Sequence, residues 1–258
     1  MFPENGGPRK VHLIASILCG NVCICNTGVC VSGKTELLYH FLCRCILPQA
    51  AGGLETDVMF VDTDYSLDML RLVGILDSRL NRDEAALYSC LSRLLVVHCS
   101  STSHLLLTLH FLETSLASRP SLSFLLIDSI SAFYWPDRCE GGASIAKQEE
   151  KLGKCSDLLG RLLRDYRITV FATCHAIRSC RPSSAAASTE SDRPYLCRPW
   201  QRLVTHRLLC SQQEVADNMT VAVGQQVFTV HCTSSFSTRT KAYRSNSFYV
   251  LDGGVTFI

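Results

Sequence analysis

The sequence contains no C-x-x-C pair among its 15 cysteines, so zinc ribbons and thioredoxin-like redox sites lack support. Its net charge of only +2 excludes a globally basic coat for nucleic acid, and any such contact depends on a local patch. Internal repeats and coiled-coil heptads are also missing. The 258 residues suit one large α/β domain with a full core. Such a chain favours reduced, mostly structural thiols and therefore a reducing compartment, the cytosol or the nucleus.

Residues 28–35 read G-V-C-V-S-G-K-T and match the phosphate-binding pattern G-x-x-x-x-G-K-[ST] in full. Two glycines let the backbone curl until its amides point at phosphate oxygens, and a following helix adds its positive N-terminal end. The lysine supplies a cation to the β- and γ-phosphates, and the threonine hydroxyl is a ligand for Mg²⁺. We therefore expect nucleotide binding by Gly28, Val29, Cys30, Val31, Ser32, Gly33, Lys34 and Thr35. The β-branched valines resist positive φ angles, which predicts weak affinity or a reshaped loop.

The N-terminal region has a basic pair followed by an apolar stretch at residues 11–19, which superficially resembles a signal peptide. The stretch is short and interrupted by polar residues, and the phosphate-binding loop that follows argues against secretion. We expect a buried strand and its approach here, with no membrane association. Six cysteines could be read as a metal cluster, although we favour structural thiols: Cys19, Cys23, Cys25, Cys30, Cys43 and Cys45.

Strand and helix patterns alternate through the first two thirds of the chain. Apolar runs predict strands at residues 22–25, 57–61, 94–99, 122–127 and 169–173. Helical periodicity predicts helices over residues 36–47, 67–80, 104–116 and 146–166. This order predicts an α/β fold with a mainly parallel central sheet and helices on both faces. After a long polar loop at residues 179–194, short strands at 204–210, 226–231, 248–251 and 255–258 predict antiparallel hairpins that continue the sheet.

Carboxylates follow two of the predicted core strands. Asp128 ends the run L-L-I-D, and burial of that strand predicts a position beside the phosphate-binding loop, where this carboxylate helps to hold Mg²⁺. The alternative is a helix-capping Asp. Asp64 follows the strand at 57–61 and is our first choice for a water-activating base, with a solvated loop-end carboxylate as the equal alternative. Asp62 is a second possible base, and Asp68 is expected to cap the next helix.

The order of these elements resembles the ATPase core of RecA-type recombinases. The matching pieces are G-V-C-V-S-G-K-T, F-V-D-T-D, L-L-I-D-S-I-S-A-F-Y-W and V-F-A-T-C-H. Further stretches, among them K-T-E-L-L-Y-H, D-M-L-R-L-V and R-P-Y-L-C, narrow the resemblance to the eukaryotic recombinase paralogues of that family. The resemblance runs from about the phosphate-binding loop to the C-terminus. It predicts a divergent N-terminal segment, residues 1–21, and a RecA-like core domain, residues 22–258.

The resemblance implies a nuclear role in homologous-recombination repair of DNA double-strand breaks and stalled forks. Such paralogues bind ATP and Mg²⁺ and assemble with other recombinase paralogues in a hetero-oligomer that acts on single-stranded or branched DNA. Two residues depart from the family pattern. Asp64 stands where active recombinases usually have Glu, and His175 stands where a polar amide senses the γ-phosphate. We therefore expect ATP binding with slow or absent hydrolysis.

By the same resemblance, two loops face the filament axis, roughly residues 135–143 and 177–194. Arginines in and after the second loop are candidates for contact with DNA phosphates: Arg178, Arg181, Arg193 and Arg198. Tyr195 and Trp200 could offer stacking faces to bases, although a core position is as reasonable for Trp200. The sequence does not identify how the chain binds a partner, and addition of a strand at a sheet edge is one plausible mode.

Three other functions remain open at this stage. An active DNA-dependent ATPase that remodels recombinase filaments would show ATP turnover stimulated by single-stranded DNA. A small-molecule kinase is disfavoured because no Arg-rich lid is recognisable. A pure scaffold would bind its partner without detectable ATP binding.

Overall fold

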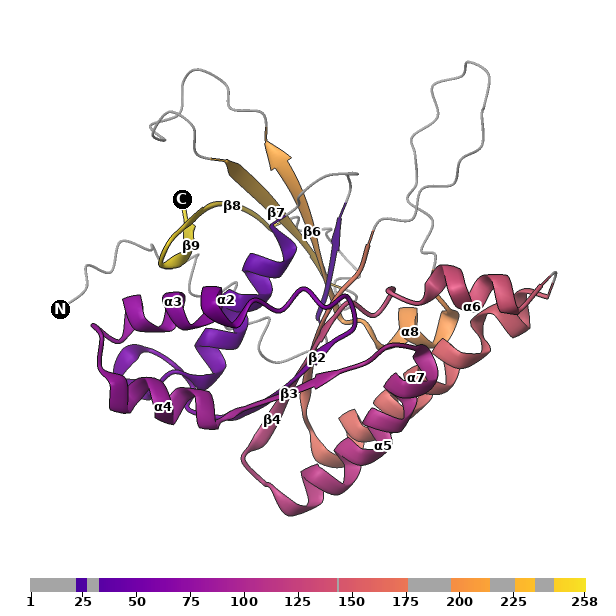
Figure 1. Ribbon diagram of the computed structural model, residues 1–258. Coiled ribbons are helices and arrows are strands. Elements are labelled where there is room, and N and C mark those ends of the chain that lie inside the picture. The colour runs from indigo at the N-terminus through magenta and orange to yellow at the C-terminus, as the bar shows by residue number, and fades with distance from the viewer. Residues whose placement is uncertain (1–21, 27–32, 143, 176–195, 214–225, 235–243) are drawn as a thin grey trace.

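A computed structural model of the chain describes residues 22–26, 33–142, 144–175, 196–213, 226–234 and 244–258 (Figure 1). Its strands are β1 (Val22–Asn26), β2 (Asp57–Asp62), β3 (Leu94–His98), β4 (Leu122–Asp128), β5 (Thr169–Thr173), β6 (His206–Gln213), β7 (Val227–Ser234), β8 (Arg244–Leu251) and β9 (Gly254–Phe257). Its helices are α2 (Lys34–Ile46), the 3₁₀ turn η1 (Gln49–Ala51), α3 (Met69–Arg79), α4 (Glu84–Ser92), α5 (Thr102–Ser118), α6 (Tyr134–Glu140), α7 (Ile145–Tyr166) and α8 (Arg198–Leu203).

All nine described strands form one sheet in the order β3-β2-β4-β5-β1-β6-β7-β8-β9. The strands from β3 to β6 are parallel, and β7, β8 and β9 continue the sheet as antiparallel hairpins. The predicted α/β class, the parallel sheet and the C-terminal hairpins are therefore confirmed. One detail is corrected. We expected β6 in an antiparallel hairpin, and it does pair in this way with β7, but its other edge pairs in parallel with β1. The strand therefore belongs to both the parallel and the antiparallel part of the sheet.

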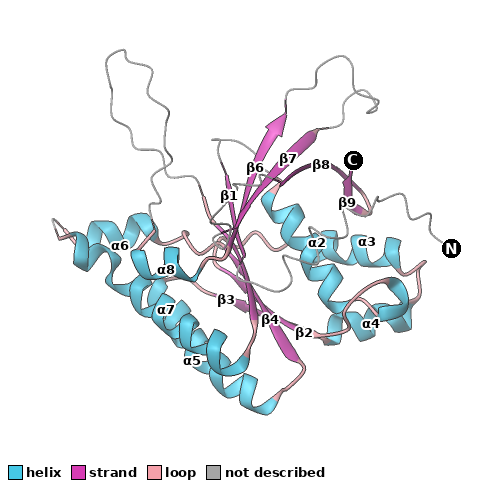
Figure 2. Cartoon of the chain, turned by 180° about the vertical axis from the view of Figure 1, so that it is seen from behind, coloured by secondary structure: helices cyan, strands magenta, loops and turns pink. Residues whose placement is uncertain are grey.

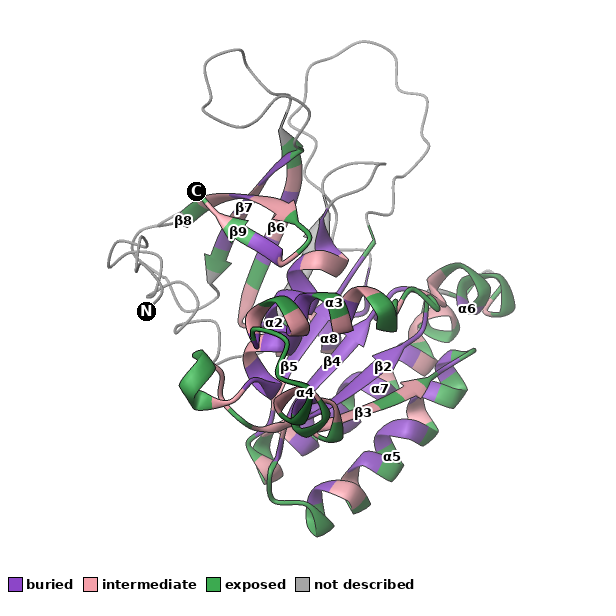
Figure 3. Ribbon diagram, turned by 60° about the vertical axis from the view of Figure 1, so that its left-hand side comes forward, coloured by how far each residue is buried: buried purple, intermediate pink, exposed green. Residues whose placement is uncertain are grey.

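Helices cover both faces of the parallel strands, with α2, α3 and α4 on one side and α5, α7 and α8 on the other (Figure 2). Successive side chains of a strand point to opposite faces, so each central strand contributes to two cores. Phe60 and Phe171 belong to the core under α2, whereas Val61 and Ala172 belong to the core under α5 and α7. Burial on both faces explains why these strands read as continuous apolar runs (Figure 3).

Three short helices were not predicted: α4, α6 and α8. Of the residues in α4 only Cys90 is buried, so the segment has no apolar stripe that would reveal a helix. The predicted N-terminal cap of α3 is confirmed, because Asp68 accepts hydrogen bonds from the amides of Leu70 and Arg71. The cap of α5 is Ser101, which accepts a hydrogen bond from the amide of His104.

Arg71 of α3 connects this helix to α2 and to the C-terminal end of β8 with the turn after it. Its guanidinium makes two hydrogen bonds, of 3.0 and 2.9 Å, to the carboxylate of Glu36 in α2. It also donates to the carbonyl of Asp252, in the turn between β8 and β9, at 2.7 Å and to that of Leu251, the last residue of β8, at 2.6 Å. A bidentate pair with further backbone acceptors fixes both partners of an arginine more firmly than a single surface contact does.

We expect Arg71→Ala to lower the free energy of unfolding by about 1–2 kcal/mol, since partial exposure screens the ion pair but four hydrogen bonds are lost. Urea denaturation followed by circular dichroism measures this change. Arg161→Ala, at an exposed position of α7, is the matched control and is expected to stay within about 0.5 kcal/mol of the parent. Equal midpoints for the two variants would show that the Arg71 contacts contribute nothing.

The ten cysteines whose side chains the structure describes are all free thiols, and nine of them are buried. Burial raises the pKa of the Cys43 and Cys155 thiols to about 12, which keeps them protonated. Four of the six cysteines of the possible metal cluster, Cys19, Cys23, Cys25 and Cys30, have side chains outside the described residues. Among the helices that the structure describes, none is both long and apolar enough to cross a membrane.

Candidate nucleotide site at the carboxyl end of the sheet

The described part of the phosphate-binding motif lies where α2 begins, against the hairpin strands. Gly33 has a φ of 64°, in the left-handed region that glycine adopts readily. A Cβ at this position would come within 3.2 Å of the rings of Phe228 and Phe248. The left-handed φ therefore favours glycine at this position, and the two rings leave little room for a Cβ. The other expected loop residues, Gly28, Val29, Cys30, Val31 and Ser32, lie outside the described residues.

Lys34 is the first residue of α2 and is 8% exposed. Its Nζ donates a hydrogen bond to the carbonyl oxygen of Cys174 at 3.1 Å and lies 3.4 Å from Nδ1 of His175. Among the described residues, no carboxylate lies within ion-pair distance of this ammonium group. A buried cation without a carboxylate partner favours an anion as its ligand.

Asp128 ends β4 beside Lys34 and Thr35 and is 3% exposed. Its carboxylate accepts hydrogen bonds from the hydroxyls of Thr35, at 3.3 Å, of Ser66, at 3.1 Å, and of Thr173. Burial raises the pKa of Asp128 above its ordinary value, against the hydrogen bonds from Thr173, Ser66 and Thr35, which lower it. The contact with Thr35 brings the two predicted Mg²⁺-associated residues together.

Asp64 follows β2 at the same edge of the sheet, and its amide donates to the carbonyl of Asp128 at 3.3 Å. Its carboxylate lies 2.6 Å from Nε2 of His175, so the predicted base and the predicted γ-phosphate sensor contact one another directly. Burial alone would raise the pKa of Asp64. The hydrogen bond from His175, a hydrogen bond from Ser129 and the charge of Lys34 together bring it below its ordinary value.

Asp62 is not available as a base, and this alternative of the sequence analysis is wrong. The residue is 1% exposed, and its carboxylate accepts hydrogen bonds from the amides of Ser66 and Leu67 at 3.1 and 3.2 Å. It also lies 3.4 Å from Nδ1 of His98 at the end of β3. Asp62 therefore shapes the loop that carries Asp64.

The donor set at this edge fits a magnesium nucleotide. Asp128 has no cationic side chain within ion-pair distance among the described residues, and hydroxyl and carboxylate oxygens are ligands that Mg²⁺ prefers. Lys34 and the N-terminus of α2 provide positive charge next to these oxygens. The described residues therefore suit a phosphate chain with its metal, with Thr35 and Asp128 as the metal-associated pair.

The arginine candidates for DNA contact are only partly described. Arg178, Arg181 and Arg193 lie outside the described residues. Arg198 begins α8 and is exposed. Trp200 is 5% exposed and belongs to the core under α7, so it offers no stacking face to a base, and that expectation is wrong.

From the sequence we expected a loop over residues 135–143 that faces the filament axis, and we did not single out the exposed aromatic residue at its start. Residues Tyr134–Glu140 instead form α6, on which Trp135 is 53% exposed. The guanidinium of Arg138 lies 5.6 Å from the centre of the Trp135 ring and 5.8 Å from that of Tyr134. It also donates to the Tyr134 hydroxyl at 2.7 Å. The i,i+3 and i,i+4 spacing of these residues could have indicated one helix face.

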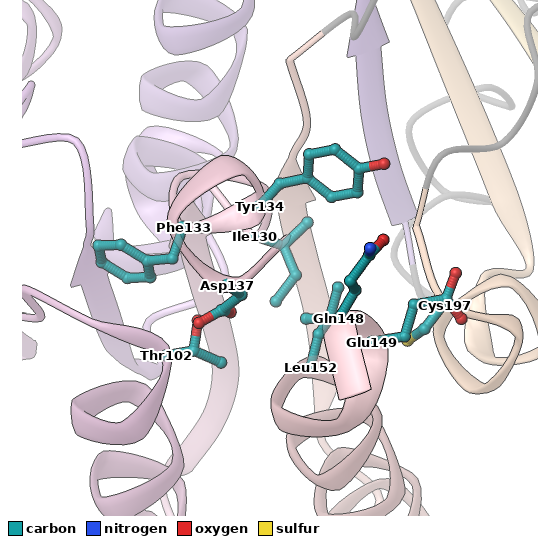
Figure 4. A pocket seen from close by; sticks show the side chains of 9 residues that line it. All are labelled: Thr102, Ile130, Phe133, Tyr134, Asp137, Gln148, Glu149, Leu152 and Cys197. Atoms are coloured by element: carbon teal, nitrogen blue, oxygen red, sulfur yellow. The ribbon is translucent and has the colours of Figure 1, made fainter. Parts of the chain in front are cut away.

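A small pocket lies under α6, and residues that line it hold this helix against its neighbours (Figure 4). The Asp137 carboxylate is directed at Thr102 at the start of α5 and accepts a hydrogen bond from its hydroxyl. Lys151 of α7 lies 3.3 Å from the same carboxylate. These contacts fix α6, and with it Trp135, to two long helices.

Comparison with known proteins decides the family. The Rad51 family model matches residues 15–198, which is most of the chain. This chain is a member of the Rad51 family. The match includes the phosphate-binding motif, Asp64, Asp128 and His175. The resemblance to RecA-type recombinases stated from the sequence motifs is therefore confirmed.

Within the Rad51 family, the mouse DNA repair protein XRCC2 is 44% identical over 236 residues, which are 88% of this chain and 81% of the mouse protein. The XRCC2 homologue of Arabidopsis thaliana is 26% identical, over 78% of this chain and 71% of that protein. The bovine DNA repair protein RAD51 homolog 4 is 27% identical over 73% of this chain and 54% of that protein. This Rad51-family chain therefore resembles XRCC2, which agrees with the narrower resemblance to eukaryotic recombinase paralogues.

Proposed function

We propose that this protein is an ATP-binding accessory subunit of a recombinase-paralogue complex. It acts in the nucleus, in homologous-recombination repair of DNA double-strand breaks and stalled forks. Membership of the Rad51 family and the similarity to a mouse DNA repair protein support a role in DNA repair by homologous recombination. The observation that carries the ATP-binding part is the meeting of Lys34, Thr35 and Asp128 at one edge of the parallel sheet.

In this proposal the residues have separate tasks. Gly33 bends the chain into α2, and Lys34 donates to the β- and γ-phosphates. Thr35 and Asp128 hold Mg²⁺, which neutralises phosphate charge when it is bound. His175 faces the γ-phosphate. The preceding motif residues, 28–32, supply backbone amides to the phosphates.

Hydrolysis is proposed to be slow or absent. Asp64 has a shorter side chain than Glu, so its carboxylate reaches less far toward an attacking water. That water has to be positioned to within a fraction of an ångström, so a base that is too short is a poor one. A phosphate-release assay with and without single-stranded DNA tests this. A robust Lys34-dependent rate that DNA stimulates would favour the alternative, an active ATPase that remodels filaments.

Assembly with other recombinase paralogues is the part of the proposal that concerns partners. Similarity to XRCC2 and to RAD51 homolog 4 supports it. The test is a pull-down from nuclear extract with the full-length chain, with and without Mg²⁺-ATP, using Lys34→Ala beside the parent. Capture of recombinase paralogues supports the proposal. Their absence under both conditions would contradict it, and capture without any ATP binding would favour a pure scaffold.

Single-stranded or branched DNA is the proposed nucleic-acid partner, reached through the complex. Arg178, Arg181, Arg193 and Arg198 are proposed to contact phosphates. Removing the charges of Arg178 and Arg181 is expected to weaken binding and to flatten its dependence on salt. An unchanged salt slope would count against these residues.

We add Trp135 to the proposed DNA contacts because it is exposed on an anchored helix and lies beside Arg138. Trp135→Ala is expected to lower the affinity for single-stranded DNA about five- to tenfold, since stacking contributes about 1–3 kcal/mol per base. The loss should persist at high salt, unlike that of an arginine variant. Fluorescence anisotropy measures both. Tyr88→Ala, at an exposed position of α4, is the control, and equal affinities of the two variants would exclude Trp135.

A further inference from the structure

Lys34, His175 and Asp64 form a hydrogen-bonded chain that joins the start of α2 to the segments after β5 and β2. Lys34 Nζ lies 3.4 Å from Nδ1 of His175, and Nε2 of the same ring lies 2.6 Å from Asp64. An ammonium group can only donate, so Nδ1 is the acceptor and carries no proton. Nε2 is then the ring nitrogen that donates a hydrogen bond to the Asp64 carboxylate.

The backbone holds the ring of His175 in this position. Its amide donates to the hydroxyl of Ser131 at 2.8 Å, and the carbonyl of the preceding residue, Cys174, accepts from Lys34 at 3.1 Å. The side chains of His175 and Asp64 are 52% and 26% exposed, so the pair is accessible from the solvent side. The contact is therefore well oriented yet reachable by a ligand.

We propose that Lys34, His175 and Asp64 form a resting clamp, which the γ-phosphate of ATP opens and ADP leaves closed. The inference rests on the proposed function, because it concerns the same nucleotide site. A phosphate oxygen accepts from the donors that the clamp uses, the Lys34 ammonium and the His175 ring. The single proton on Nε2 cannot be donated to Asp64 and to a phosphate at the same time.

Two consequences follow. Without a γ-phosphate, the Asp64 carboxylate is occupied by His175 and is kept from activating water. Opening the clamp costs part of the binding free energy of ATP, so removing Asp64 should tighten ATP binding and leave ADP binding nearly unchanged. Removing a negative charge near a triphosphate would also tighten binding, and the test has to separate these two causes.

A double-mutant cycle separates them. Affinities for Mg²⁺-ATP and Mg²⁺-ADP are measured by titration calorimetry for the full-length parent, Asp64→Ala, His175→Ala and the double variant. We expect Asp64→Ala to bind ATP about three- to tenfold more tightly than the parent, and ADP within about twofold. In the His175→Ala background this gain should disappear. An equal gain in both backgrounds, or for both nucleotides, would overturn the clamp in favour of simple charge repulsion.

A second readout needs no nucleotide. Nitrogen chemical shifts of the His175 ring in the free, full-length protein should show a protonated Nε2 and an unprotonated Nδ1, and Asp64→Ala should shift Nε2. His110→Ala, at an exposed position of α5, is the control and should leave the His175 signals unchanged. If neither the parent nor any variant binds ATP, the proposed function is wrong, and so is the proposed distinction between ATP and ADP. If ATP binds but the His175 signals ignore Asp64→Ala, the clamp alone is overturned.

Discussion

Lys34→Ala is expected to lower the affinity for Mg²⁺-ATP by about a hundredfold, which corresponds to about 2.7 kcal/mol. The buried ammonium of Lys34 has no carboxylate partner among the described residues and lies at the start of α2. A phosphate group is therefore a suitable acceptor for its hydrogen bonds. Alanine removes both the charge and the donors. Titration calorimetry with the full-length chain measures the loss.

The control for Lys34 is Lys154→Ala. Lys154 is exposed on α7, and its ion pair among the described residues is with Glu150 one turn away, so its removal should leave ATP affinity unchanged. Circular dichroism confirms that both variants are folded, since Lys34 also donates to the carbonyl of Cys174. A less than threefold loss for Lys34→Ala, with both variants folded, would contradict nucleotide binding at this site.

The free energy of unfolding is expected to fall by about 2 kcal/mol between pH 7.5 and pH 5, through His40 alone. Burial, followed by the charges of Arg79 and Arg44, lowers the pKa of this histidine to about 3 in the folded protein. Its Nδ1 lies 3.3 Å from Arg79, and its ring packs against Phe257. In the unfolded chain the imidazole regains a pKa of about 6.5.

The sign follows from proton uptake. Between the two pKa values the unfolded chain binds a proton at His40 and the folded protein does not, so acid stabilises the unfolded state. Stability is therefore lost as the pH falls below about 6.5. His40→Gln cannot take up this proton, and the difference in unfolding free energy between pH 7.5 and pH 5 should shrink by about 2 kcal/mol.

Urea denaturation at both pH values measures this effect, and His110→Gln is the matched control. His110 is exposed, so its replacement should leave the pH dependence as it is in the parent. All other titrating groups are common to the three proteins and cancel in the comparison. The same pH dependence in parent and His40→Gln would show that His40 is charged or accessible in the folded state.

The central strands and the longest helix were predictable because their patterns are local. In β4, residues 124–127 form an unbroken apolar run that ends at an aspartate, and α7 repeats its apolar residues at helical spacing from Leu152 to Tyr166. The phosphate-binding motif likewise needs only eight consecutive residues to be read. From these features the fold class, the family and the residues Lys34, Thr35 and Asp128 all followed.

The short helices and the pairing of β6 were less readable. Isolated helices of six or seven residues are unstable in water, so α6 and α8 depend on contacts such as that of Asp137 with Thr102. The parallel pairing of β6 with β1 joins segments that are far apart in the chain. Neither leaves a periodic signal in its own segment.

The motifs alone indicated which groups lie at the carboxyl edge of the sheet: a loop lysine, a strand-end aspartate and a histidine in place of an amide. Their contacts depend on how distant segments pack together in the fold. His175 and Asp64 are 111 residues apart yet are in hydrogen-bond contact, while Asp62, two residues before Asp64, is buried at the end of β2 and binds the amides of the following loop. The reason is physical: apolar periodicity is set by neighbouring residues, whereas the contacts of a polar side chain depend on which strands the fold brings together.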